Sequence, residues 1–333
     1  MNDRDLSTLE RELIEHAAAG TTCDVSGRPD DDRRVCAAVI YELCVGARWA
    51  VHAKGVRLTG ARIEEPLDFE HATLRAPLKL RDCDLRGAVT FTSASVPALD
   101  LAGSKFTQPL LLERTKITDE LRLARAELTG VDGDGYALNA NAMHIGGDAF
   151  LRKGFKAAGA ISLLGASIDG QLDMGGAKLT GTDSDGYALV AYEMLVGVDA
   201  FLRKGFEAAG AISLMGASIG GLDMAGAKLT GTDSGGYALV ADGMHVGAAV
   251  LRERVEAAGA ISLLSANISR QLDMSGAKLT GTDSRGVALA ADRMHVGTDA
   301  FLSYGFEPAG AIRLLGANIG GQLNMTGAKL TGT

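Results

Sequence analysis

Residues 61–85 read ARIEEPLDFEHATLRAPLKLRDCDL, and a unit of eleven residues recurs through them. Each unit opens on a small residue followed two positions later by a large apolar one, as in Ala61-x-Ile63. A second apolar pair, such as Leu67-x-Phe69, completes the unit. Because side chains of a β-strand alternate between its two sides, both members of a pair face the same way. Strands this short do not make a globular sheet, and they predict a solenoid in which each coil pairs with the next.

The eleven-residue unit runs to about residue 130, after which a longer repeat of about 51 residues takes over. The stretch AISL at 160–163 returns at 211–214 and 260–263, and as AIRL at 311–314. Each longer repeat holds four elevens and an insert of six or seven residues rich in Asp and Gly. The pattern leaves open which large residue of 199–206 faces inward. The expected solenoid therefore has two parts, which are regular units over 51–130 and four longer repeats over 131–333.

Residues 1–50 are expected to form a helical cap. Ser7 and Glu10 have the spacing of a capping box, and the apolar residues that follow recur at helical intervals up to Gly20. The stretch 21–32 is rich in Asp, Gly and Ser and predicts a loop, and a second helix is expected over about 33–45. Two short amphipathic helices cannot bury their apolar stripes alone, so we expect them to cover the open end of the solenoid.

Segments such as Gly165-Ala166-Ser167-Ile168 resemble the A-[DN]-L-x-x motif of the pentapeptide-repeat proteins. The resemblance covers about residues 55–333 and implies an all-β fold, a right-handed, four-sided parallel β-helix. Two fives and one extra residue make eleven here, so we expect about 22 residues per coil. For some family members the resemblance implies a DNA mimic that modulates a topoisomerase such as gyrase. The chain is also similar to an actinobacterial group often labelled oxidoreductase, a label that no residue of this sequence supports.

Composition and charge narrow the classes of partner and compartment. The 333 residues carry a net charge of −8, which argues against a surface that binds nucleic acid directly. The segment 1–16 is acidic and has no apolar run, so we expect no signal peptide. No stretch approaches the roughly 18 apolar residues of a membrane span. The four cysteines form no C-x-x-C pair, and we expect them reduced in the cytoplasm.

Two periodic sets of polar residues are candidates for chemistry. His144, His245 and His295 each stand between a Met and a β-branched residue, so alternation predicts that they face solvent. Equivalent residues of successive long repeats are expected two coils apart, about 9.6 Å, which is too far for two imidazoles to share a metal ion, and the second repeat has Leu195 at this position. The second set, Asp173 with its repeats at 223 and 273, lies near a Lys ladder and predicts alternating surface charge. We expect no catalytic residue, no cofactor and no metal, which favours a binding protein over an enzyme and leaves the enzyme open as an alternative.

The inserts are the predicted recognition surface, because they project from one edge of the solenoid at each repeat. A D-x-D-G loop also resembles a calcium turn, but the second Asp is missing from the later two copies, and Asp, Ser and Gly are ordinary turn formers. A weak cation site stays open as an alternative to a plain loop. The candidate recognition residues are Asp132, Asp134, Asp183, Asp185, Asp233 and Asp283.

The sequence favours a rigid, non-enzymatic scaffold that binds a protein partner it cannot name. The first alternative is the DNA-mimicking gyrase modulator, and the second is an enzyme acting on a polymer laid along the solenoid. The last coil is expected to be an apolar edge at which two chains form an end-to-end homodimer about a two-fold axis, unless the chain is a piece of a longer protein. The candidate interface residues are Ile319, Leu323, Met325 and Leu330.

Overall fold

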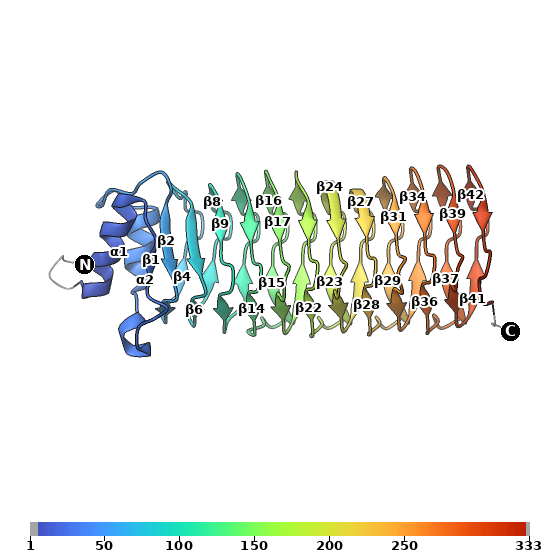
Figure 1. Cartoon of the computed structure of the whole chain (residues 1–333), viewed down its shortest axis with the longest axis horizontal. Coiled ribbons are helices and arrows are strands. Elements are labelled where there is room, and N and C mark those ends of the chain that lie inside the picture. The colour runs from blue at the N-terminus through green and yellow to red at the C-terminus, as the bar shows by residue number, and fades with distance from the viewer. Residues whose placement is uncertain (1–5, 331–333) are drawn as a thin grey trace.

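A computed structural model describes residues 6–330, and the ends 1–5 and 331–333 lie outside the described residues. Parallel strands stack coil upon coil from the N-terminal helices to the far end of a rod (Figure 1). Four strands make up a typical coil, and each pairs with its equivalents in the coils before and after. The predicted parallel β-helix is therefore confirmed, with four faces.

One sheet of 21 strands supplies two adjacent faces of the rod. The first face contains β8 Ser95–Val96, β12 Lys116–Ile117, β16 His144–Ile145, β20 Ser167–Ile168, β24 Leu195–Phe201, β27 Ser218–Asp223, β30 His245–Val246, β34 Asn267–Ile268, β38 His295–Val296 and β42 Asn318–Ile319. The second face shares β24 and β27 and also contains β1 Cys23–Asp24, β2 Val56–Thr59, β5 Leu78–Arg81, β9 Leu99–Asp100, β13 Leu121–Arg122, β17 Ala149–Phe150, β21 Leu172–Asp173, β31 Ala249–Val250, β35 Leu272–Asp273, β39 Ala300–Phe301 and β43 Leu323–Asn324.

Two further sheets of 11 strands each form the other two faces of the rod. The third face contains β3 Arg62–Ile63, β6 Asp84–Leu85, β10 Lys105–Phe106, β14 Glu127–Leu128, β18 Lys156–Ala157, β22 Lys178–Leu179, β25 Glu207–Ala208, β28 Lys228–Leu229, β32 Glu256–Ala257, β36 Lys278–Leu279 and β40 Glu307–Pro308. The fourth contains β4 Leu67–Asp68, β7 Val89–Thr90, β11 Leu110–Leu111, β15 Tyr136–Asn139, β19 Ala160–Ser162, β23 Tyr187–Val190, β26 Ala211–Ser213, β29 Tyr237–Val240, β33 Ala260–Ser262, β37 Val287–Ala290 and β41 Ala311–Arg313.

Strand pairing confirms the predicted coil length. Phe106 pairs with Leu128, which lies two eleven-residue units further along the chain. Where an insert intervenes the coil is longer, and Ile117 pairs with Ile145, which lies two units and one insert further along. The longer repeat of the sequence is therefore one coil with an insert followed by one coil without.

The inward-facing residues form one continuous apolar core along the rod. Both members of the predicted pairs are buried, for example Ile63 at 1% and Phe69 at 0% exposure. The structure also decides the register that the pattern left open within 199–206. Leu202 and Phe206 are buried there, whereas Phe201 is half-buried on the outside of the second face.

The N-terminal helices pack on the first coils, as expected (Figure 1). Helix α1, Thr8–Ala19, begins with the complete Ser7–Glu10 capping box and ends at Gly20, which adopts the left-handed conformation. It contacts β1 and β2, while α2, Ala37–Cys44, contacts β2 and β4.

Two predictions for this segment were wrong. Residues 21–32 are not only a loop, because β1 pairs in parallel with β2 and extends the second face. The second helix begins at Ala37 rather than near residue 33, after a short 3-10 helix, η2, Asp30–Arg33. The reason is the backbone bond from Val35 N–H to the Arg62 carbonyl, which holds the chain extended beside β3.

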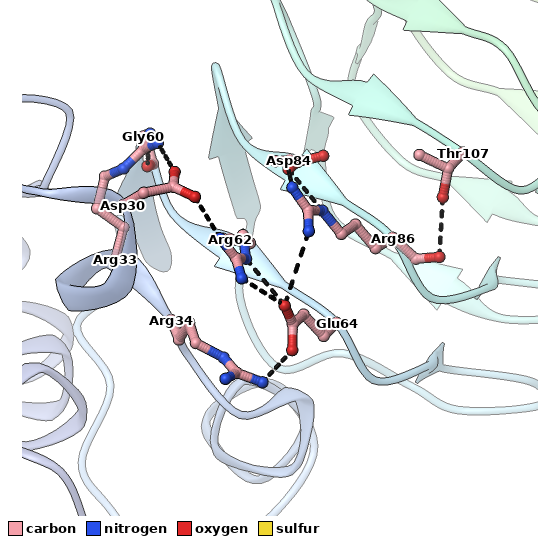
Figure 2. Close-up of polar contacts among 9 residues, drawn as sticks. All are labelled: Asp30, Arg33, Arg34, Gly60, Arg62, Glu64, Asp84, Arg86 and Thr107. Atoms are coloured by element: carbon pink, nitrogen blue, oxygen red, sulfur yellow. Dashed lines mark hydrogen bonds and ion pairs between the residues drawn. The ribbon is translucent and has the colours of Figure 1, made fainter.

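A polar network fastens this entry segment to the solenoid (Figure 2). Arg62 lies at its centre, donating to Glu64 Oε1 at 2.9 Å and to Asp30. Glu64 also accepts from Arg34, and Arg33 donates to the Gly60 carbonyl at 3.0 Å. Arg86 extends the network to the next coil through its ion pair with Glu64 at 3.8 Å, and it also pairs with Asp84 at 2.8 Å (Figure 2). Its carbonyl accepts a bond from the Thr107 hydroxyl.

Candidate protein-binding surface

Each insert connects the third face to the fourth through a tight turn built on its first Asp. Asp183 Oδ1 accepts the backbone N–H groups of Asp185 at 3.0 Å and Tyr187 at 2.8 Å. The first Asp of the other three inserts accepts the same pair of bonds. This use of a side-chain oxygen is the Asx-turn chemistry that Asp favours.

Successive inserts are joined by a ladder of Tyr–Asp hydrogen bonds. The Tyr136 hydroxyl donates to Asp183 Oδ2 at 3.1 Å, and Tyr187 repeats the bond to Asp233 at 2.9 Å. Tyr237 makes the third such bond, to Asp283 at 3.0 Å. Sequence reasoning missed this ladder, although its signal was present as an Asp followed four residues later by Tyr in three inserts.

The ladder changes what the inserts offer to a partner. Asp183 and Asp283 are buried, at 8% and 4% exposure, and the first Asp of the other two inserts is half-buried. Only the second-position residues Asp134 and Asp185 are exposed carboxylates. Within residues 6–330 no group of three or more His, Cys, Asp or Glu side chains is placed to hold a metal ion. Recognition by the inserts stays a prediction, and it would depend on the exposed second positions.

Asp283 is expected to make stability depend on pH. Its burial raises the pKa, but bonds from Val287, Arg285 and the Tyr237 hydroxyl outweigh burial and lower the pKa to about 2. The folded pKa lies below the unfolded value of about 3.9, so the carboxylate stabilises the fold above about pH 5, and this contribution is lost as the pH falls through 2. Asp283→Asn should lower the free energy of unfolding by about 2 kcal/mol at pH 7 and by about half as much at pH 3.

Urea unfolding at the two pH values measures this difference. The matched control is Asp134→Asn, an exposed insert carboxylate expected to change stability by at most about 0.5 kcal/mol. Equal losses for Asp283→Asn at pH 7 and pH 3 would contradict the assigned role.

The other periodic sets are placed as follows. His245 and His295 are exposed on the first face, and half-buried His144 lies 3.8 Å from Asp169, so the outward orientation is confirmed. The histidines do not form an unbroken row. The same strand position on the intervening coils is occupied by Ser167, Leu195, Ser218 and Asn267.

The Asp and Lys ladders lie on different faces. Asp173 on the second face pairs with Arg152 at 2.6 Å, and Arg152 also stacks over Phe150. Lys178 on the third face pairs instead with Glu207 at 2.5 Å. The predicted charge alternation is therefore made by Lys and Glu of neighbouring coils, while Asp173 and Asp223 pair with Arg.

Of the end residues named from the sequence, Met325 and Leu330 line an apolar hollow of about 330 Å³. Leu323 and Leu330 are exposed, and Ile319 and Met325 are half-buried. The end-to-end homodimer stays a prediction. If it forms, light scattering should give about twice the monomer mass of 34.4 kDa, and Leu330→Lys should return the mass to that of a monomer. A monomer mass at every concentration for both proteins would rule the homodimer out.

The largest departure from the repeat is an apolar patch that wraps the first face. Its five members are all exposed: Leu164 at 44%, Tyr192 at 37%, Leu195 at 50%, Val198 at 51% and Met215 at 38%. The Tyr192 and Met215 carbonyls each accept a backbone hydrogen bond from the preceding coil. The corner residues Leu164, Tyr192 and Met215 therefore stack on three successive coils. Leu195 lies across the face and Val198 at its far corner, between Gly170 and Gly220.

The patch exists because one coil differs from its own repeats. Where the second repeat has Tyr192, the others have Asn141, Asp242 and Asp292. Where it has Leu195, they have His144, His245 and His295. Where it has Val198, they have the smaller residues Gly147, Ala248 and Thr298. Three outward positions within seven residues have therefore become apolar together.

The backbone departs from the repeat at the same place. Strands β24 and β27 span seven and six residues and run through the corner that separates the first and second faces elsewhere. Gly197 is required here as Gly146, Gly247 and Gly297 are in the other repeats, because a Cβ on it would lie 2.3 Å from the Asp169 carbonyl oxygen. Leu195 and Val198 therefore lie on one continuous strand, β24.

Comparisons with known proteins add no relative, since no family model, curated protein or solved structure matches this chain. No helix within the described part of the chain is long and apolar enough to cross a membrane.

Proposed function

We propose that this chain is a non-enzymatic, rigid β-solenoid that binds a protein partner through the apolar patch. The observation that carries the proposal is the exposure of Tyr192, Leu195 and Val198 on one coil whose repeats are polar or small at those positions. Contiguous exposed apolar side chains mark interaction sites, whereas singly scattered ones need no explanation.

The patch also forgoes a stabilising bond. Asn141, Asp242 and Asp292 each accept the backbone N–H of the next coil, from Leu164 at 3.2 Å, Leu264 at 3.0 Å and Leu315 at 3.0 Å. Tyr192 stands at this position in the second repeat, and a phenol side chain has no oxygen at the position of the Asn or Asp Oδ1. A surface that gives up local stability for exposed apolar area is typical of function.

The test replaces three patch residues by those that stand at the same positions in another repeat. A triple variant, Tyr192→Asp, Leu195→His and Val198→Thr, has the residues of the fourth repeat and should fold, with a melting temperature equal to or above that of the wild type. Proteins retained by the wild type from a lysate of the source organism should be lost on the variant and kept on Leu315→Asp, which removes an exposed apolar residue outside the patch. Equal retention by the wild type and the triple variant would overturn the proposal.

The pentapeptide-repeat relationship is part of this proposal and is supported by the four faces of the parallel β-helix, although the coil of two eleven-residue units is two residues longer than four fives. A cytoplasmic location is supported by four free cysteines, and burial raises the pKa of Cys44 and Cys83 to about 12. No observation favours the DNA-mimicking alternative, because Lys and Glu alternate along the third face, as in the pairs Lys156–Glu127 and Lys329–Glu307. A gyrase supercoiling assay would test that alternative.

A further inference from the structure

We infer that the partner segment bound by the patch is an amphipathic α-helix whose apolar side is flanked by Lys or Arg. The inference rests on the proposed function and adds the chemistry of the partner. Three features of the patch carry it, namely its strand pairing, its dimensions and its charge.

The strand pairing excludes recognition by strand addition. β24 pairs with β20 and β21 on one side and with β27 on the other, and β27 continues to β30 and β31. The patch therefore lies in the middle of a sheet and has no open edge. A partner must dock through side chains rather than through backbone hydrogen bonds, which is how helices bind apolar surfaces.

The dimensions fit one helix laid along the coil direction. Leu164, Tyr192 and Met215 occupy three successive coils, and strand spacing places the outer two about 10 Å apart. Leu195 and Val198 are three residues apart on β24, about 10 Å, and Tyr192 lies on the turn that precedes this strand. A helix is about 10 Å in diameter and rises about 1.5 Å per residue, so the apolar side of a helix of three to four turns can contact all five patch residues.

The charge selects a basic helix. The patch coils over 164–170, 192–199 and 215–221 contain the carboxylates Asp169, Glu193 and Asp199 and no Lys or Arg. Asp169 and Glu193 are exposed beside the apolar residues. A second copy docked patch to patch would bring these carboxylates against their own equivalents, whereas Lys or Arg flanking a partner helix would complement them.

The test uses synthetic helices with the full chain. A labelled 14-residue peptide of Leu and Lys, with Leu at i, i+3, i+4 and i+7, is titrated with the wild type and followed by fluorescence anisotropy at 150 mM salt. Saturable binding should weaken at least tenfold for the triple variant, although that variant is more acidic, and should persist for Leu315→Asp. A Leu/Glu helix and a scrambled Leu/Lys peptide should each bind at least tenfold more weakly. Asp169→Asn with Glu193→Gln should weaken the Leu/Lys helix several-fold and flatten its salt dependence.

Each other outcome overturns the inference in a recognisable way. Equal binding by the wild type and the triple variant would mean that the peptide does not use the patch. Preference for the Leu/Glu helix would reverse the charge assignment. A dimer in light scattering that the triple variant abolishes would make a second copy the occupant. If no peptide binds while retention of partner proteins still depends on the patch, the helix assignment fails and the proposed function stands.

Discussion

Replacing Ile168 by Asp is expected to lower the free energy of unfolding by about 3 kcal/mol or more. Ile168 is 1% exposed, and β20 places it between Ile145 and Val196 in the interior row of the first face. A carboxylate there would have no partner in an apolar core, so it must be neutralised or must open the coil. Urea unfolding followed by circular dichroism gives the loss.

The matched control for Ile168→Asp is Lys178→Ala on the third face. Lys178 pairs with Glu207 at the surface, and such pairs contribute little because solvent screens them. Its loss should change stability by at most about 0.5 kcal/mol. If the two variants unfold at the same urea concentration, the inward and outward assignment is wrong.

Removing residues 1–50 is expected to cause aggregation or the loss of cooperative melting. The deletion takes away α1, α2 and β1, and with them Tyr41, whose ring stacks on Phe69 at 5.6 Å between centroids. It uncovers the first coil, including the paired edge of β2 and the buried Phe69. Exposed strand edges and open apolar ends are known aggregation sites. Size-exclusion chromatography and thermal melting measure the effect.

A point variant separates loss of the cap from loss of chain length. Leu13 is fully buried in α1, so Leu13→Asp should reproduce the effect of the deletion at least in part. Arg11 is exposed on the same helix, and Arg11→Ala should melt like the wild type. A soluble truncated chain that melts cooperatively at the wild-type temperature would contradict the role of the cap.

Local pattern predicted much of this fold, because in a solenoid each coil meets only its neighbours. The small-x-large unit was enough to assign Ile63 and Phe69 to the interior. The Ser7–Glu10 capping box was enough to start α1, since all its bonds lie within one turn. The same reasoning misplaced the start of α2, where a bond from Val35 to the distant Arg62 overrides local helix preference.

The sequence by itself determined the coil length, the inward-facing rows, the histidine row on the outside and the position of the inserts. Each follows from a short period along the chain. The tertiary structure alone decided that Tyr136, Tyr187 and Tyr237 bond to the next insert, which buries two of the predicted recognition carboxylates. It also assembled the patch, because Leu164, Tyr192 and Met215 are distant in sequence and become neighbours only when coils with and without inserts stack in register.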